Sequence, residues 1–196
     1  MTINKIWVLI LLVVSFVLPI NIYASTVEPY DQSYFTKADG IVEDSTKEQN
    51  SVVEIAMKYI GTPYVFGGTS VNGFDCSGLV QYVFKEAGYD IPRTSKEQSI
   101  IGDSKTVTYR GNLKIGDILF FDFRETPDFK PVTSAQGALN YASNVANERI
   151  VNGISHVGVY IGNNKMVHAG SNGVAVANLN KEYYKSKFIY GKRIIQ

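Results

Sequence analysis

The sequence predicts one α+β domain, because its helical patterns come first and its strand patterns follow. Apolar residues recur at helical spacing over about 47–60 and from Asp75 to about Gly88. Strand-like apolar runs come later in the chain, over 117–123, 155–161, 165–169, 173–177 and 188–195. With 196 residues, 45% of them apolar, the chain is long enough for one hydrophobic core.

The first 24 residues have the parts of a secretory signal peptide. Lys5 supplies the positive charge, residues 6–20 form an apolar run, and Ala24 is a small residue at which we expect cleavage. The run is shorter than the ~20 residues of a spanning helix, and Pro19 interrupts it, although an uncleaved anchor is an alternative. We therefore expect a secreted protein without stable membrane insertion after cleavage.

Residues 25–50 form an acidic segment with little apolar periodicity, which we interpret as a flexible leader. A propeptide that covers a site would have the same composition. The folded domain is then expected over 51–196, and its first helix over about 47–60. Ser51 and Glu54 fit the spacing of a capping box, and Gly61 and Pro63 end the helical pattern.

Composition excludes several classes of function. Nineteen basic residues stand against 18 acidic ones, so the formal charge is +1 and falls to zero without Lys5. Such a chain has no long-range field for nucleic acid, and we expect no nucleic-acid partner. One cysteine and two histidines make no internal disulfide and a poor metal site, so we expect neither a metal nor a cofactor.

The single cysteine lies where a helix begins. Asp75 is expected to cap that helix, so Cys76 falls in its first turn, where backbone N–H groups and the helix dipole favour a thiolate. The alternative is a small buried side chain. The carboxylate of Asp75 would raise the pKa of the thiol if it faced the sulfur, so we expect it to cap the helix or to bind substrate.

A nucleophilic thiol needs a base, and the available histidines are His156 and His168, both on predicted strands. A hairpin turning about Gly162 would set the two opposite each other on one face of a sheet. A two-residue turn at Asn163 and Asn164 would instead set His168 opposite Val159, on the wrong face, unless a bulge corrects the register.

Two further features have simple structural interpretations. Gly67 and Gly68 are not followed by the Gly-Lys-Ser/Thr of a phosphate-binding loop, so we expect a turn near the site. Arg93 follows Pro92 and is interpreted as a structural contact or loop donor.

An ordered series of motifs resembles the NlpC-type cell-wall cysteine peptidases. The matching blocks are GTPYVFGG (61–68), FDCSGLVQY (74–82), IPRTS (91–95), KIGDILFF (114–121), SHVGVYIG (155–162) and MVHA (166–169). The resemblance covers about residues 52–195. It implies a compact papain-like fold in which the cysteine helix packs on an antiparallel sheet that carries the base.

The resemblance also implies roles for residues. Cys76 would be the nucleophile, His156 the base and acid, and His168 the residue that orients His156. Tyr64, Asp75 and Ser77 would line the substrate side, with Asp75 meeting the free amine of an N-terminal L-alanine. The family's usual bond joins γ-linked D-glutamate to the diamino acid of peptidoglycan stem peptides, which are therefore the expected partners.

One departure from the family pattern is an insertion over about 122–153, where the histidine strand would normally follow at once. A helix is expected within it over about 135–149, and the insertion would form a lid, narrow the cleft or dock a partner.

Three alternatives remain open at this point. An amidase or acyltransferase would use the same framework with another bond or acceptor. A non-catalytic cell-wall binding protein would keep the fold and survive loss of Cys76. An effector acting on a rival's wall would have an inhibitor protein, whose identity the sequence does not give.

Overall fold

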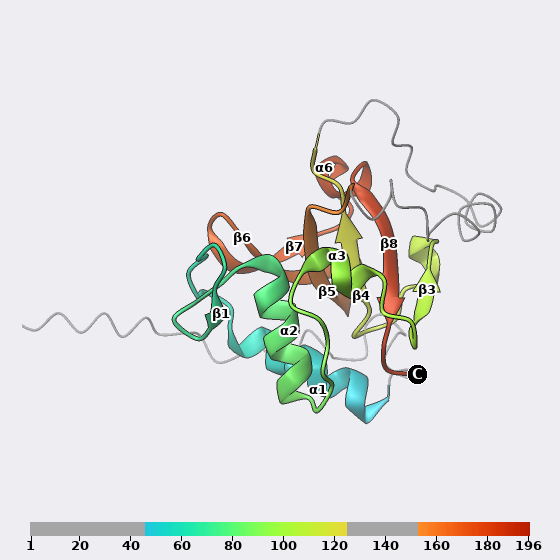
Figure 1. Ribbon diagram of the computed structural model, residues 1–196. Helices are drawn as coiled ribbons and strands as arrows, with labels where there is room; N and C mark the ends of the chain where they lie inside the picture. Colours follow the sequence, from blue (N-terminus) through green and yellow to red (C-terminus); the bar gives the residue numbers. More distant parts are fainter. Residues whose placement is uncertain (1–45, 125–152) are drawn as a thin grey trace, which may run out of the picture.

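The computed structural model describes residues 46–124 and 153–196 (Figure 1). Their core is a six-stranded antiparallel sheet of order β3-β8-β4-β5-β6-β7. The strands are β3 (Lys105–Val107), β4 (Ile118–Phe121), β5 (His156–Gly162), β6 (Lys165–Gly170), β7 (Gly173–Asn178) and β8 (Phe188–Arg193). The other elements are α1 (Lys47–Lys58), β1 (Thr69–Ser70), β2 (Gly73–Phe74), α2 (Cys76–Glu86), α3 (Ser95–Ser99), η4 (Arg110–Asn112) and α6 (Glu182–Lys185).

Helix α1 begins earlier than its predicted cap. Thr46 is the N-cap and forms a capping box with Gln49, so the prediction of a box at Ser51 and Glu54 is wrong. Both pairs have the required spacing, but the Thr46 pair lies where the backbone is still extended. The side-chain amide of Gln49 also donates to the carbonyl of Ile195, which ties the start of the domain to its end.

Helices α1 and α2 pack together on one face of the sheet, as Figure 1 shows. Their apolar sides meet β4, β5 and β6 in the main core. Each of these side chains is at most 8% exposed; from the helices they include Val52, Val53, Ala56, Leu79, Val80, Val83 and Phe84, and from the sheet Ile118, Phe120, Val157, Val159 and Val167. The α+β prediction, with helices packed on an antiparallel sheet, is confirmed.

The opposite face of the sheet carries a second cluster. Strand β4 is buried on both faces, because Ile118 and Phe120 enter the main core while Leu119 and Phe121 enter the second cluster. The second cluster also holds Tyr160, Met166, Ala177, Leu179 and Phe188, with Leu113, Phe123 and Tyr184 at its border. The aromatic side chains at this border form one wall of the site described below.

The β5–β6 hairpin combines the predicted two-residue turn with the bulge that it needed. Asn163 and Asn164 both have positive φ, of 49° and 53°, as a tight hairpin turn requires. The register then shifts between Tyr160 and Gly162. Continuing the pair Val159↔Val167 sets His168 across from Gly158, so the two histidines are diagonal neighbours on one face and not directly opposite.

A buried ion pair joins the end of β8 to the residue before β4. Arg193 on β8 donates from Nε and Nη2 to the two oxygens of Asp117, both at 2.8 Å. The carboxylate of Asp117 is fully buried, and it also accepts from the backbone N–H of Lys114 at 2.8 Å. Both side chains are buried, so removing one of them would leave the other charge without its partner.

The other predictions divide by location. The predicted strands lie within two residues of β4 to β8, whereas the short elements α3, β3 and α6 were not predicted. The signal peptide, most of the leader and the helix predicted over 135–149 fall outside the described residues. In the described ranges, no helix has both the length and the apolar character needed to cross a bilayer.

Candidate active site

The start of α2 is fixed by the glycine loop before it. Gly67 has a φ of 76°, and the carbonyl of Gly68 accepts from the N–H of Asp75 at 3.1 Å. A Cβ on Gly78 would lie only 2.0 Å from that carbonyl oxygen, so glycine is needed where the loop crosses the first turn of the helix. This packing confirms the predicted turn and places Cys76 at the beginning of α2.

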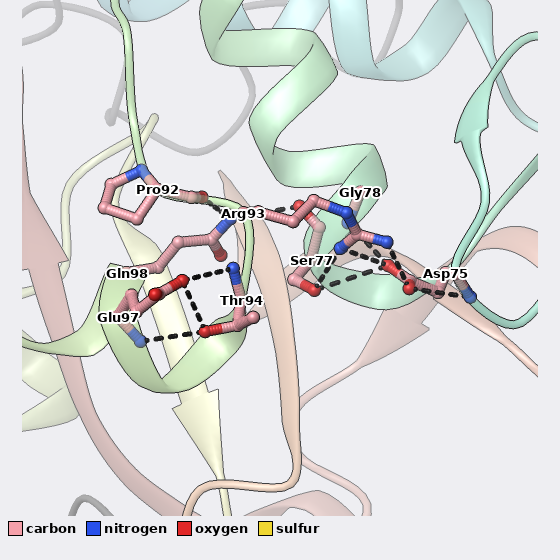
Figure 2. Close-up of polar contacts among 9 residues, drawn as sticks. Asp75, Ser77, Gly78, Pro92, Arg93, Thr94, Glu97 and Gln98 are labelled. Carbon is pink, nitrogen blue, oxygen red and sulfur yellow. Dashed lines mark hydrogen bonds and ion pairs between the residues drawn. The ribbon is translucent and has the colours of Figure 1, made fainter.

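Asp75 caps α2 and at the same time binds Arg93 (Figure 2). Its Oδ1 accepts from the N–H of Gly78 at 2.6 Å, from Arg93 Nη1 at 3.0 Å and from Ser77 Oγ at 3.3 Å. Its Oδ2 accepts from Arg93 Nη2 at 2.6 Å and from the N–H of Gly67 at 3.0 Å. Burial raises the pKa of Asp75, but these donors outweigh it and hold the pKa below its usual value.

Arg93 extends the same network. Its Nη1 also donates to Ser77 Oγ at 2.9 Å, so Ser77 is held between Arg93 and Asp75 (Figure 2). The neighbouring Gln98 donates to the carbonyls of Ser77 and Pro92, at 3.0 and 2.8 Å. The prediction that Arg93 makes a structural contact is confirmed, and that contact is the first turn of the cysteine helix.

Cys76 is half-buried, and its surroundings do not favour the thiolate that its helix position predicted. Burial raises the pKa of the thiol, and the carboxylate of Asp75 raises it further. The backbone amides of Val157, Ser77 and Cys76 itself act in the opposite direction but are outweighed. The backbone amides at the helix start therefore lower the pKa of the thiol as expected, but not enough to offset burial and Asp75, and the net shift favours the thiol.

The two histidines form a hydrogen-bonded pair. His156 Nε2 lies 2.9 Å from His168 Nδ1, and the rings meet edge to face at a centroid separation of 5.0 Å. The thiol of Cys76 interacts with the backbone amide of Val157, the residue after His156. Sequence reasoning thus selected three residues that the fold brings to one end of β5, and no hydrogen bond joins the described Cys76 and His156 side chains.

Tyr184 is a further partner that the sequence did not suggest. Its hydroxyl lies 3.4 Å from His168 Nε2, so both ring nitrogens of His168 have a neighbour. The ring of His168 packs against that of Tyr184 at 5.9 Å, and Phe123 contacts the ring of His156 at 5.2 Å. Sixteen residues separate Tyr184 from His168, and no spacing rule in the sequence connects a short polar helix to this pair.

Both histidines are held neutral. Burial, with His168 beside it, lowers the pKa of His156 to about 3. Burial lowers the pKa of His168 to about 4. Aromatic rings pack against both imidazoles, and the lowered pKa values favour the neutral form of each at neutral pH.

A cavity of about 450 Å³ opens beside the histidine pair. His156, His168 and Tyr184 form one wall of it, and β7 with the loops at its two ends forms the rest. Its remaining lining residues are Phe123, Gly170, Ser171, Asn172, Gly173, Ala175, Val176, Ala177, Asn178, Lys181 and Tyr183.

The predicted substrate-side residues lie at the start of α2 and in the loop before it. Tyr64 is 38% exposed, in a loop whose Val65 and Phe66 are also exposed, at 46% and 91%. Burial raises the pKa of Tyr64, and Cys76 and Asp75 raise it further, which sets all three side chains in one neighbourhood. Asp75 and Ser77 are buried in the Arg93 network.

Within the described ranges, no three His, Cys, Asp or Glu side chains gather as a metal site would require. The groups available for chemistry are therefore a thiol, two imidazoles, a tyrosine hydroxyl and backbone amides. Together they match the needs of acyl transfer through a cysteine nucleophile.

Comparison with known proteins agrees with this arrangement. The NlpC/P60 family model matches residues 61–132 and 135–193. The chain is 33% identical over 150 residues to the probable peptidoglycan endopeptidase LytE of Bacillus subtilis, covering 74% of this chain and 34% of that protein. It is 36% identical over 161 residues to the gamma-DL-glutamyl hydrolase of the same organism, covering 81% of this chain and 32% of that protein.

A solved structure shows the same fold. The crystal structure of an NlpC/P60 family protein from Bacillus cereus matches with a TM-score of 0.57 and 26% identity, covering 76% of this chain and 40% of that one. The chain spans about a third of the length of the two Bacillus subtilis relatives. The family match extends over most of the chain and includes Cys76, His156 and His168, and the chain belongs to the NlpC/P60 family.

Proposed function

We propose that the protein is a secreted or cell-wall-associated cysteine endopeptidase that hydrolyses peptidoglycan stem peptides at the bond between γ-D-glutamate and the diamino acid. The observation that carries the proposal is the 2.9 Å contact between His156 Nε2 and His168 Nδ1, at the end of β5 where Cys76 meets the backbone. The family and the names of its relatives support the substrate class. The gamma-DL-glutamyl hydrolase supports the choice of bond.

The proposed reaction has two halves. In the first, the sulfur of Cys76 attacks the γ-carbonyl carbon of D-glutamate while His156 takes the thiol proton; the C–N bond then breaks as His156 protonates the departing amine. In the second, His156 takes a proton from water, which attacks the thioester, and the proton returns to the sulfur as the acid is released. Burial raises the pKa of the thiol and lowers the pKa of the imidazole, which favours the neutral pair, so in this scheme the proton moves as the carbon–sulfur bond forms.

The oxyanion is assigned to backbone amides at the start of α2. The N–H groups of Gly78 and Leu79 are already bonded to the side chain and carbonyl of Asp75. Those of Cys76 and Ser77 interact with the sulfur, so they are the donors nearest the point of attack.

The contact between His168 and Tyr184 supports a definite proton arrangement. If His168 carries its proton on Nε2 and donates it to the Tyr184 oxygen, its Nδ1 is an acceptor for the Nε2–H of His156. His156 then has a free Nδ1 lone pair with which to take the thiol proton. His168 and Tyr184 are positioning residues in this scheme, because they act through His156.

On the acyl side we propose that Tyr64, Asp75 and Ser77 recognise the L-Ala-γ-D-Glu portion. Tyr64 is 38% exposed, so its side chain can contact a substrate directly. Asp75 already accepts five hydrogen bonds, so a substrate amine would share its charge with Arg93 or displace one of these donors. The free-amine preference is thus a proposal about the whole Asp75–Arg93 pair.

The domain organisation belongs to the same proposal. Residues 1–24 are a signal peptide, residues from 25 to the start of α1 a leader, and the rest the catalytic domain, with the insertion at about 122–153 beside the histidine strand. Thr46 is the N-cap of α1, so the leader is proposed to end before it.

The test uses the chain from residue 25 and synthetic stem peptides of sequence L-Ala-γ-D-Glu-diamino acid-D-Ala. Mass spectrometry is expected to find L-Ala-D-Glu and the diamino dipeptide as products. A peptide with D-glutamate linked through its α-carboxyl and one with an acetylated N-terminus serve as matched controls. A muramyl form of the same peptide is included: cleavage of its sugar–peptide link alone would establish an amidase instead, and transfer to an added amine without hydrolysis would establish an acyltransferase.

A further inference from the structure

We infer that the cavity between the histidine pair and α6 binds a carboxylate on the leaving side of the cleaved bond, with Lys181 as its cation. The inference rests on the proposed endopeptidase function and assigns it a recognition site. The carboxylate has two possible sources in a stem peptide: the side chain of diaminopimelate, or the C-terminus of the peptide.

The position of the cavity points to the leaving side. His156 is the group that would protonate the departing amine, and its ring forms part of the cavity wall together with His168 and Tyr184. The acyl-side residues Tyr64 and Asp75 do not line the cavity, and neither does Cys76, so only a part of the substrate that extends past His156 can reach it. A residue whose amine leaves toward His156 would therefore place its remaining atoms against β7 and α6.

The size of the cavity suits one or two residues. Its volume of about 450 Å³ lies in the range of small-ligand sites. Strand β7 lines the cavity in part with small residues, Gly173, Ala175 and Ala177, whose short side chains leave space beside the strand.

The charge of the lining is one-sided. Lys181 is the cation among the lining residues, and none of them is a carboxylate. Lys181 is exposed, and in the described part of the chain no ion pair engages its ammonium group. Amides and hydroxyls from Asn172, Asn178, Ser171 and Tyr183 complete the polar lining. A single cation with neutral donors around it favours an anionic group.

Carboxylates differ between the natural forms of the stem peptide. A diaminopimelate side chain ends in a carboxylate and an ammonium group, whereas a lysine side chain ends in ammonium alone. The C-terminal carboxylate is present in both. If the site binds the side-chain carboxylate, it would distinguish diaminopimelate from lysine. If it binds the C-terminal carboxylate, it would distinguish a C-terminal acid from a carboxamide.

The test compares four stem peptides, with diaminopimelate or lysine at the third position and with a C-terminal acid or carboxamide. Each is cleaved by the wild type, by Lys181→Ala and by Lys185→Ala. Lys185 is the matched control because it lies one turn further along α6 and does not line the cavity. We expect Lys181→Ala to lower kcat/KM by about 5-fold for the peptides whose carboxylate is read, with the others unchanged.

A second readout does not depend on turnover. The Cys76→Ala chain is titrated with the diamino acid-D-Ala product, followed by NMR, and the Lys181→Ala change is expected to weaken binding by a similar factor. Equal effects of Lys181→Ala on all four peptides, or the same loss in Lys185→Ala, would overturn the carboxylate site while leaving the endopeptidase intact. Failure of every chain to cleave any peptide would overturn the proposed function, and product binding insensitive to Lys181 would then overturn the site as well.

Discussion

The two sides of the candidate active site are built from opposite kinds of chemistry. On the helix side, Asp75 is fully engaged by Arg93 and by backbone N–H groups, and its charge lies close enough to raise the pKa of Cys76. On the sheet side, two imidazoles touch one another among aromatic rings, and burial lowers the pKa of both. The helix side is held together by an ion pair, whereas burial on the sheet side disfavours a charge on either imidazole.

The two sides are expected to contribute differently to catalysis. A carboxylate next to a nucleophilic thiol is unfavourable for the thiolate, so its presence needs another reason. Capping α2 and holding Arg93 and Ser77 supply that reason, and both fix the position of the sulfur. The sheet side is proposed to accept a proton and return it; burial keeps its imidazoles unprotonated and so free to act as bases, but also lowers their affinity for the proton.

On the sheet side, we expect the largest loss of activity when the proposed general base, His156, is replaced. His156→Gln should lower kcat by about 10³-fold or more, because the thiol proton has no acceptor. His168→Gln keeps an acceptor for the Nε2–H of His156 and should retain far more activity than His168→Leu. Kinetics on the stem peptide, with circular dichroism to confirm folding, separate these variants. Equal losses in the two His168 variants would contradict an orienting role for His168.

Two Asp–Arg pairs allow the helix side to be compared with a purely structural pair. Asp117→Asn leaves Arg193 buried without its charge partner and should lower the free energy of unfolding by about 3 kcal/mol or more. Asp75→Asn keeps a capping side chain, and its pair is more exposed, with Arg93 at 32% against 10% for Arg193, so about 1–2 kcal/mol is expected. Urea denaturation measures both losses.

The same two variants should differ in a second way. Asp75→Asn removes a charge that raises the pKa of Cys76, so the pH midpoint of thiol alkylation should move down, whereas Asp117→Asn should leave it in place. Asp75→Asn should also raise KM for the free-amine peptide. An unchanged alkylation midpoint in Asp75→Asn would show that the Asp75 charge does not reach the sulfur.

A smaller effect is expected in the pH dependence of stability. Both histidines have pKa values below the ordinary 6.5, at about 3 and about 4, so between these values and 6.5 the unfolded chain binds more protons than the folded one. Stability from the pair is fully present above pH 6.5 and is lost as the pH falls, by up to about 1.4 kcal/mol per pH unit for each histidine. Urea titrations at pH 7, 6 and 5 should show a shallower slope for His168→Gln than for the wild type. Identical slopes would mean that His168 is not held neutral.

The smallest expected effect tests the Tyr184 contact. Tyr184→Phe removes the oxygen to which His168 is proposed to donate, and it should lower kcat by about 3- to 10-fold with little change in KM. Tyr89→Phe is the matched control, because that ring packs against Phe84 and, among the described residues, neither contacts a histidine ring nor lines the cavity. In ¹⁵N NMR spectra, the wild type should show a protonated Nε2 on His168, and Tyr184→Phe a mixture of tautomers. No change in either the rate or the tautomer would remove Tyr184 from the mechanism.

Much of the fold could be predicted because its signals are local. The period of apolar residues marks α1 and α2, and Asp75 followed by an apolar helix marks the cap of α2. The strands of the central sheet are short apolar runs, and they lie where predicted. The edge strand β3 was not predicted, because only one of its three residues is buried and such a strand has no apolar run.

The site was predictable as far as its chemistry depends on scarce residues. One cysteine and two histidines leave few choices of nucleophile and base, and the family motifs surround them. Tyr184 and Lys181 could not be found in this way, because thirteen tyrosines and many lysines give no reason to select one. Their positions depend on tertiary structure: the fold brings α6 against β6 and β7, so that Tyr184 lies beside His168 and Lys181 lines the cavity.

We propose that Cys76, with His156 as its base and His168 as a positioning residue, hydrolyses the bond after γ-D-glutamate. The most direct measurement is mass spectrometry of one stem tetrapeptide incubated in parallel with the wild-type chain from residue 25 and with Cys76→Ala. We predict L-Ala-D-Glu and the diamino dipeptide from the wild type, and intact substrate from a folded Cys76→Ala. The same products from both chains, or cleavage by the wild type at another bond, would contradict the account.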